Sequence, residues 1–263
     1  MASVVPFLGM QFLDADLEGI RGAIRKHLAT PGFFYAVTPN VDHVVTYHGS
    51  ADDDLRDAYD GAALQICDSR ILSALARPSG RRLTPVPGSD LTRDILERGL
   101  DADGAGAPSA LRIAVIGPSQ AAFGRLRRRY PKAALTFLPS GRMKPGHPAW
   151  AAAVEMTAKA EWDLILICLS FPKQEFFARD LRRHGRCHGF GLCVGASIDF
   201  LTGRQRRAPR AFQKVGLEWL HRLASDPKRM WRRYLVRGPA IFSLAARQYA
   251  QDARKHLRFS RSS

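Results

Sequence analysis

The sequence has few cysteines, no long apolar run and no metal-binding motif. Its four cysteines (Cys67, Cys168, Cys187 and Cys193) stand singly, and none of its eight histidines lies in an HExxH pattern. We therefore expect free thiols in a reducing compartment, with neither a disulfide framework nor a zinc site. No apolar run reaches the roughly 18 residues that span a bilayer. The opening residues lack the cationic start of a signal peptide, so none is expected.

Acidic residues are scarce at one end of the chain. From residue 204 to residue 263 there are 16 Lys and Arg but only three acids, which gives this segment a net charge of +13. The whole chain carries +16, so the first 203 residues contribute only +3. The basicity therefore belongs to a C-terminal segment and indicates an anionic partner for it.

Between residues 1 and 203, short apolar runs alternate with segments of helical spacing. An opening strand or hairpin is expected around Gly9, and further strands are expected over residues 32–37, 62–67, 111–116, 134–138 and 163–169. The last run is uninterrupted, as in strands that are buried on both faces. Alternating strands and helices predict an α/β fold with a doubly wound, mainly parallel, Rossmann-like sheet. We divide the chain into this domain, residues 1–203, and a basic helical appendage, residues 204–263.

The appendage is predicted to contain two amphipathic helices. Asp226 and Pro227 suit the N-cap and first position of one helix, Gly238-Pro239 ends it, and a second begins near Ala240. The basic face of the first helix has residues at four-residue spacing: Arg229, Arg233 and Arg237. Apolar side chains gather on other faces: Trp231, Tyr234 and Leu235 in the first helix, and Phe242, Ala245, Ala246, Tyr249 and Ala253 in the second.

A basic helix with an aromatic and aliphatic face is typical of a surface that lies on anionic lipid. Each Lys or Arg near such a membrane contributes about 1 kcal/mol to binding. The plainer interpretation, a solvated charged face, leaves the many apolar partners of these charges unexplained. We therefore predict that the appendage associates with a membrane.

Polar residues follow several of the predicted strands. In a doubly wound sheet, ligands bind where the carboxyl ends of the strands lead into loops. The candidate ligand-binding residues are therefore Thr38, Asn40, Asp68, and those within 117–120, 170–175 and 195–199.

The motifs at these strand ends also follow one another in a recognisable order. They are TPNVDHVV (38–45), CDS (67–69), PGSDL (87–91), WDLILICLSFPKQE (162–175), VGASIDFLTGRQRRAP (194–209) and GLEWLHRLASDPKRMWRRYL (216–235). Together they resemble the WecG/TagA/CpsF family of bacterial glycosyltransferases, glycosyltransferase family 26, from about residue 5 to 245. The specific part of the match is PKQE followed by GxxxDFxxGxxxRAP and GLEWLxRL.

The resemblance implies an inverting, metal-independent transferase. Such an enzyme moves a sugar from a UDP-sugar to a polyprenyl-diphosphate-linked saccharide in exopolysaccharide or other surface-glycan biosynthesis. The resemblance implies Asp68 as the catalytic base and Thr38, Asn40 and Gln174 as substrate-binding residues. It also implies self-association and a cytoplasmic enzyme held peripherally on the inner face of the plasma membrane by its appendage.

Neither a metal nor a cofactor is expected beside the nucleotide-sugar donor. Two Asp-Ala-Asp triplets, residues 14–16 and 101–103, imitate the DxD motif that chelates a metal in other glycosyltransferases. The first lies at a predicted helix start and the second in a linker of small residues. Because neither follows a buried strand, we do not interpret them as metal ligands.

Two positions depart from the family pattern. Pro85 stands where the family usually has an arginine near the site, and Arg81 or Arg82 is the nearby candidate to replace it. Ser69 follows Asp68 where the family often has glycine. Both changes lie beside the expected sugar pocket, so they leave the donor sugar open.

Each candidate side chain also has a structural interpretation. A carboxylate at Asp68 can take the proton from an acceptor hydroxyl as that hydroxyl attacks the anomeric carbon, a contribution of about 10²–10⁴-fold. The alternative is that Asp68 caps the next helix. Thr38 and Asn40 suit hydrogen bonds to a sugar or phosphate, but Asn40 also suits a helix cap.

The later strand ends leave similar alternatives open. Gln174 suits a nucleotide or sugar contact, whereas Glu175 in the first turn of a helix favours the helix dipole. Asp199 is either a ribose or sugar ligand or a turn-fixing residue. The backbone amides of 117–120 are placed to meet a diphosphate. Without a metal, a cation must stabilise the leaving diphosphate. The candidates for this role or for membrane contact are Arg207, Arg210, Arg222, Arg229 and Arg233.

Two other classes of protein compete with the transferase hypothesis. A basic stripe also fits a nucleic-acid-binding protein. However, no known nucleic-acid module is present and the charges are interleaved with Trp and Leu, so no nucleic acid partner is expected. An NAD-dependent dehydrogenase would share the sheet type, but the sequence lacks the GxGxxG fingerprint.

Overall fold

The computed structural model describes residues 2–51, 53–100, 111–141, 143–205, 208–209, 212 and 217–259, with the backbone alone at 229 and 255–259. The strands are β1 (Ser3–Phe7), β2 (Met10–Asp14), β3 (Phe33–Val37), β4 (Leu64–Ile66), β5 (Arg112–Ile116), β6 (Ala134–Leu138), β7 (Leu164–Ile167) and β8 (Gly189–Cys193). They form one sheet in the order β1-β2-β4-β3-β8-β7-β5-β6. β1 and β2 form the antiparallel hairpin expected around Gly9, and all other neighbouring pairs are parallel. The mainly parallel α/β sheet is confirmed.

Two consecutive parts of the chain build the two halves of this sheet. Strands β1 to β4 precede residue 100, strands β5 to β8 follow residue 111, and the halves join where β3 pairs with β8. The parallel strands all end at the same edge, so the loops after β3 and β4 face those after β5, β7 and β8. Ligands of doubly wound sheets bind at such an edge.

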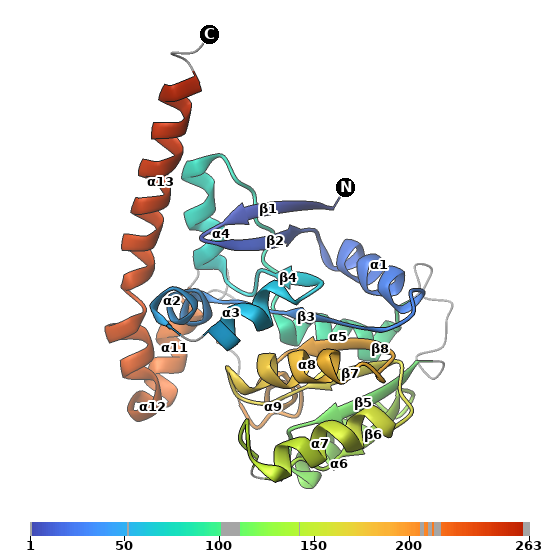
Figure 1. The fold of residues 1–263 in the computed structure, drawn as a ribbon. Coiled ribbons are helices and arrows are strands. Elements are labelled where there is room, and N and C mark those ends of the chain that lie inside the picture. The colour runs from blue at the N-terminus through green and yellow to red at the C-terminus, as the bar shows by residue number, and fades with distance from the viewer. Residues whose placement is uncertain are drawn as a thin grey trace.

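Helices cover both faces of the sheet (Figure 1). They are α1 (Leu17–Leu28), α2 (Val41–Gly49), α3 (Asp53–Asp60), α4 (Arg70–Ala76), α5 (Gly88–Arg98), α6 (Gln120–Arg129), α7 (Pro148–Lys159), α8 (Lys173–His184) and α9 (Ser197–Leu201). One apolar cluster holds α2, α3, α4, α7 and α8, and the other holds α1, α5, α6 and α9. Strand β7 contributes Ile165 and Ile167 to the first cluster and Leu164 and Leu166 to the second. Its uninterrupted apolar sequence is explained by burial on both faces.

The sheet and its flanking helices, up to α9, form the body of the molecule. The C-terminal segment adds a helical tail to one side of this body. It comprises α11 (Glu218–Ser225), α12 (Pro227–Trp231), the π-helical η3 (Arg232–Arg237) and α13 (Ala240–Phe259). The predicted helix start at Pro227 and the break at Gly238-Pro239 are confirmed. Helix α13 runs along the edge of the body past α2 and α4 (Figure 1). None of the helices in the described ranges is long and apolar enough to cross a bilayer.

One side of α13 packs on the body. Ile241 and Ala245 are buried, Tyr249 donates a hydrogen bond to the carbonyl of Leu75 (2.5 Å), and Asp252 pairs with Arg81. Phe242, in contrast, is 60% exposed, although the sequence analysis placed it on the same side as Ala245 and Tyr249. Ile241, and not Phe242, therefore continues the face that packs on the body.

Candidate active site

A cavity of about 1000 Å³ opens at the carboxyl edge of the sheet, between the body and the tail. The five candidate catalytic and substrate-binding residues all line it, namely Thr38, Asn40, Asp68, Gln174 and Asp199. From the tail, Arg222 and Arg233 line it as well. Arg207, Arg210 and the side chain of Arg229 lie outside the described residues. With residues 117–119, which also line it, the structure gathers candidates from five loops and the tail around one space.

Asp68 follows β4 and is half-buried. Its Oδ1 accepts a hydrogen bond from the backbone N–H of Gly88 (2.8 Å), at the start of α5, and Oδ2 accepts none from the described residues. The next helix in the chain, α4, is capped by Ser69, whose hydroxyl accepts from the N–H of Leu72 (3.3 Å). The alternative interpretation of Asp68 as the cap of that helix is therefore wrong, and Ser69 fills the role.

The environment of Asp68 suits proton transfer. Burial raises its pKa to about 6, against the opposing effects of the Gly88 hydrogen bond and the charge of Arg222. A carboxyl group with this pKa is ionised at neutral pH but is a better proton acceptor than an ordinary aspartate. One oxygen is fixed by the backbone and the other is left for a ligand.

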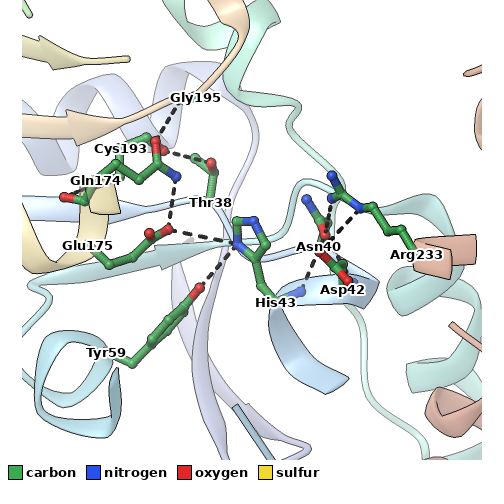
Figure 2. Close-up of polar contacts among 10 residues, drawn as sticks. All are labelled: Thr38, Asn40, Asp42, His43, Tyr59, Gln174, Glu175, Cys193, Gly195 and Arg233. Atoms are coloured by element: carbon green, nitrogen blue, oxygen red, sulfur yellow. Dashed lines mark hydrogen bonds and ion pairs between the residues drawn. The ribbon is translucent and has the colours of Figure 1, made fainter. Parts of the chain in front are cut away.

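Thr38 and Asn40 follow β3 and are both tied into the framework. The hydroxyl of Thr38 donates to the carbonyl of Cys193 (2.8 Å), which fastens the end of β3 to the end of β8. Asn40 is the N-cap of α2, as its structural interpretation held, and its Oδ1 also accepts from Arg233 (3.2 Å). Asn40 thus links the first half of the sheet to the tail (Figure 2).

Both polar ends of the Gln174 amide are occupied. Its Oε1 accepts from the N–H of Gly195 (2.7 Å), and its Nε2 donates to Oε1 of Glu175 (2.8 Å). Gln174 therefore shapes the cavity wall by holding the loop after β8. Glu175 has no exposed surface, and burial raises its pKa to about 7.

A histidine that the sequence analysis did not single out lies beside this pair. His43, in the first turn of α2, lines the cavity; its Nδ1 lies 3.1 Å from the hydroxyl of Tyr59 and 3.9 Å from Oε1 of Glu175 (Figure 2). Its ring stacks on Phe171 with centroids 4.0 Å apart. The sequence feature that could have identified His43 is its place in the motif TPNVDHVV, in the first turn of the helix that follows a strand.

The tail places two guanidinium groups in the cavity wall. Arg233 lies 3.3 Å from the carboxylate of Asp42, and Arg222 pairs with Glu218 (2.9 Å) and stacks on Phe200 at 4.8 Å. Both arginines face the body (Figure 2 draws Arg233 beside Asn40 and Asp42). These cations supply positive charge close to Asp68.

The remaining wall is formed by the loops of the second sheet half. Gly117 has φ +111° and lies so close to Cys168 that a Cβ would meet its carbonyl at 2.5 Å, so the close approach requires glycine. Ser119 caps α6 through a bond from the N–H of Ala122 (3.3 Å). Asp199, in α9, lies 3.7 Å from Arg204, at the cavity margin.

Two further residues do not occupy the place that the sequence analysis gave them. Arg81 pairs with Asp252 of α13 (2.5 Å), and Arg82 is 87% exposed beside Asp14 (3.9 Å). Neither lines the cavity, so neither takes the place of the arginine that is expected at the position of Pro85. Asp14 accepts a bond from the N–H of Thr84 (2.7 Å), which gives it a structural role.

Possible metal ligands do not cluster in the described part of the chain, where no group of three His, Cys, Asp or Glu could hold an ion.

A protein-family model matches most of the chain. That model, described as the glycosyl transferase WecG/TagA/CpsF family, matches residues 5–255, from within β1 to within α13. The chain therefore belongs to the WecG/TagA/CpsF family of glycosyltransferases.

Proposed function

We propose that this chain is an inverting glycosyltransferase that moves a sugar from a UDP-sugar to a polyprenyl-diphosphate-linked saccharide, with Asp68 as the general base. The observation that carries the proposal is the place of Asp68 between two cavities. The larger one is described above. A second, of about 370 Å³, lies between α2, α4 and the tail, and Asp68 lines both.

The two cavities differ in ways that suit two substrates. The larger is bordered by strand ends and by the 117–119 turn, which suits a nucleotide diphosphate. The smaller has an apolar wall that includes Trp219, Leu235 and Phe242. This wall supports a lipid-linked acceptor, whose sugar would lie at Asp68.

In the proposed reaction, the acceptor hydroxyl meets the free Oδ2 of Asp68. The hydroxyl oxygen attacks the anomeric carbon as its proton passes to Asp68, and the bond from that carbon to UDP breaks with its electron pair leaving on the diphosphate. One displacement inverts the anomeric configuration. Arg222 and Arg233 would stabilise the charge on the leaving UDP, so we propose that no metal is required.

We also propose that the tail attaches the enzyme to the inner face of the plasma membrane. Large apolar side chains along it are exposed: Trp231 (44%), Leu235 (56%), Val236 (61%) and Phe242 (60%). Exposed apolar groups beside a strongly basic segment favour an anionic lipid surface over nucleic acid. The alternative nucleic-acid function predicts tighter binding to DNA than to anionic vesicles at physiological salt.

The test is UDP release from a panel of UDP-sugars, with and without a polyprenyl-diphosphate-linked saccharide, in the presence of EDTA. We expect release that requires the acceptor, persists in EDTA and is lost in Asp68→Ala. UDP binding without turnover would contradict the donor or acceptor assignment. Failure to bind UDP at all would contradict the proposed chemistry.

A further inference from the structure

His43 is held rigidly in the wall of the larger cavity. Its side chain is 6% exposed, its ring stacks on Phe171 with an angle of 13° between the planes, and its backbone N–H reaches Oδ1 of Asn40 (3.5 Å). The hydroxyl of Tyr59 contacts its Nδ1 (3.1 Å). The contacts with Phe171 and Tyr59 fix the ring, which presents its remaining polar atom, Nε2, in one orientation.

The contact with Tyr59 decides which ring nitrogen carries the proton. Tyr59 has no exposed surface, and within the described residues His43 is the one hydrogen-bond partner of its hydroxyl. A buried hydroxyl that only accepted would leave its own hydrogen unpaired, which is costly. The hydroxyl therefore donates to Nδ1, so Nδ1 is the acceptor and Nε2 carries the hydrogen.

The imidazole is also neutral. Burial, and then the nearby charge of Arg233, hold the pKa of His43 well below its ordinary value. Glu175, 3.9 Å from Nδ1, accepts a hydrogen bond from Gln174 and has a raised pKa for the same reason of burial. The cavity wall therefore offers a neutral N–H donor at this point, beside the positive charge of Arg233.

We propose that Nε2–H of His43 donates a hydrogen bond to an oxygen of the transferred sugar, and that Tyr59 fixes the tautomer that makes this possible. The inference rests on the proposed function, since it names a contact with the donor. A neutral donor is matched to an uncharged hydroxyl or carbonyl oxygen, whereas charged guanidinium groups are matched to the diphosphate. His43 thus acts on the choice of sugar, and Arg222 and Arg233 act on the UDP moiety.

The tautomer can be measured without any substrate. In protein with ¹⁵N-labelled histidine, we expect His43 to show the neutral Nε2–H form by long-range ¹H–¹⁵N correlation, with the resonance assigned from its loss in His43→Ala. In Tyr59→Phe, which keeps the packed ring, the population of this tautomer should fall. A protonated ring or a wild-type Nδ1–H form would overturn the inference.

The ligand is tested by calorimetry with UDP, UDP-glucose and UDP-N-acetylglucosamine. We expect His43→Asn to raise the Kd of the UDP-sugar that wild type prefers about tenfold, the effect of one lost hydrogen bond, and to leave the Kd of UDP unchanged. His43→Gln, whose amide N–H reaches the Nε2 position, should recover part of the loss. The matched control is His48→Ala on the same helix, because His48 contacts the carbonyl of Leu8 (2.9 Å) outside both cavities.

Equal weakening of UDP and UDP-sugar by His43→Asn would place the contact on the nucleotide and overturn the inference, as would binding that no His43 variant changes. Failure of the proposed function is a different result, because no UDP-sugar would then bind to wild type.

Discussion

Two carboxyl groups near the cavity have raised pKa values because both are removed from water, yet they do different things. Asp68 keeps one oxygen open to the cavity, so its raised pKa improves it as a proton acceptor. Glu175 is sealed under the cavity wall, where it holds the amide of Gln174. Water cannot stabilise the ionised carboxylate of Glu175, so its ionisation lowers the stability of the folded state.

The Glu175→Gln variant tests this cost. The free carboxyl titrates near 4.5 and the folded one near 7, so between these values the unfolded state releases a proton that the folded state keeps. The free energy of unfolding of wild type should therefore fall as pH rises from 4.5 to 7 and stay reduced above 7. Glutamine removes this loss, so the variant should be more stable at pH 8, by about 3 kcal/mol at most.

Urea unfolding between pH 5 and pH 8 measures the difference between variant and wild type. The gap should widen with pH for Glu175→Gln and stay constant for Glu161→Gln, a control at an 88% exposed side chain. A gap that does not change with pH would show that Glu175 titrates like an exposed carboxylate.

At this scale the sequence predicted which residues gather at one cavity, but not their contacts. The rule that ligands meet the carboxyl ends of strands identified Thr38, Asn40, Asp68 and Gln174, and all of them line one cavity. It could not reveal that both ends of Gln174 are occupied by Gly195 and Glu175. Gly195 is distant in the chain, and although Glu175 is the next residue, a single-sequence pattern does not record which side chains turn toward each other.

At the scale of the elements, ion pairs hold the tail against the body. Asp42 is 7% exposed and receives Arg233 and Arg237 of η3, each at 3.3 Å. Pro227 and Gly238-Pro239 allowed the helix limits to be predicted, because both act locally on the backbone. Which face of α13 packs was not predictable, since Ile241 and Phe242 are equally apolar and tertiary contacts alone select Ile241.

We expect Asp42→Asn to loosen the tail. Arg233 and Arg237 would lose their counter-charge, and pairs of this partial burial contribute about 1–2 kcal/mol. Hydrogen exchange over residues 218–237 should therefore accelerate about tenfold, while exchange in β7 and β8 should not change. The matched control, Asp53→Asn, removes a 97% exposed carboxylate that lies 3.8 Å from Arg56. Equal exchange in the two variants would contradict the docking role of Asp42.

For the whole molecule, alternation of strands and helices was enough to predict a parallel α/β sheet. The strand order was not predictable, because periodicity says which face of a strand is buried and nothing about its neighbour. That order matters for function, since the pairing of β3 with β8 brings the two halves of the chain together at one cavity.

The proposed attachment to a membrane also belongs to the whole molecule. We expect wild type to bind anionic vesicles far better than zwitterionic ones, and less as salt is raised. The double variant Trp231→Ser, Val236→Ser should weaken anionic binding about tenfold, because it removes two exposed apolar groups of the tail. Val4→Ser, a 63% exposed control in β1, should bind like wild type. Equal losses in the two proteins would contradict a membrane-facing tail.

The most direct test of the account compares donor binding and turnover in Asp68→Asn. Asparagine keeps an oxygen for the N–H of Gly88 but cannot accept the proton. We predict an unchanged Kd for the UDP-sugar, a loss of turnover of about 10²–10⁴-fold, and disappearance of the wild-type rise in kcat/KM through pH about 6. Turnover within a few-fold of wild type, with the same pH profile, would show that Asp68 is not the base.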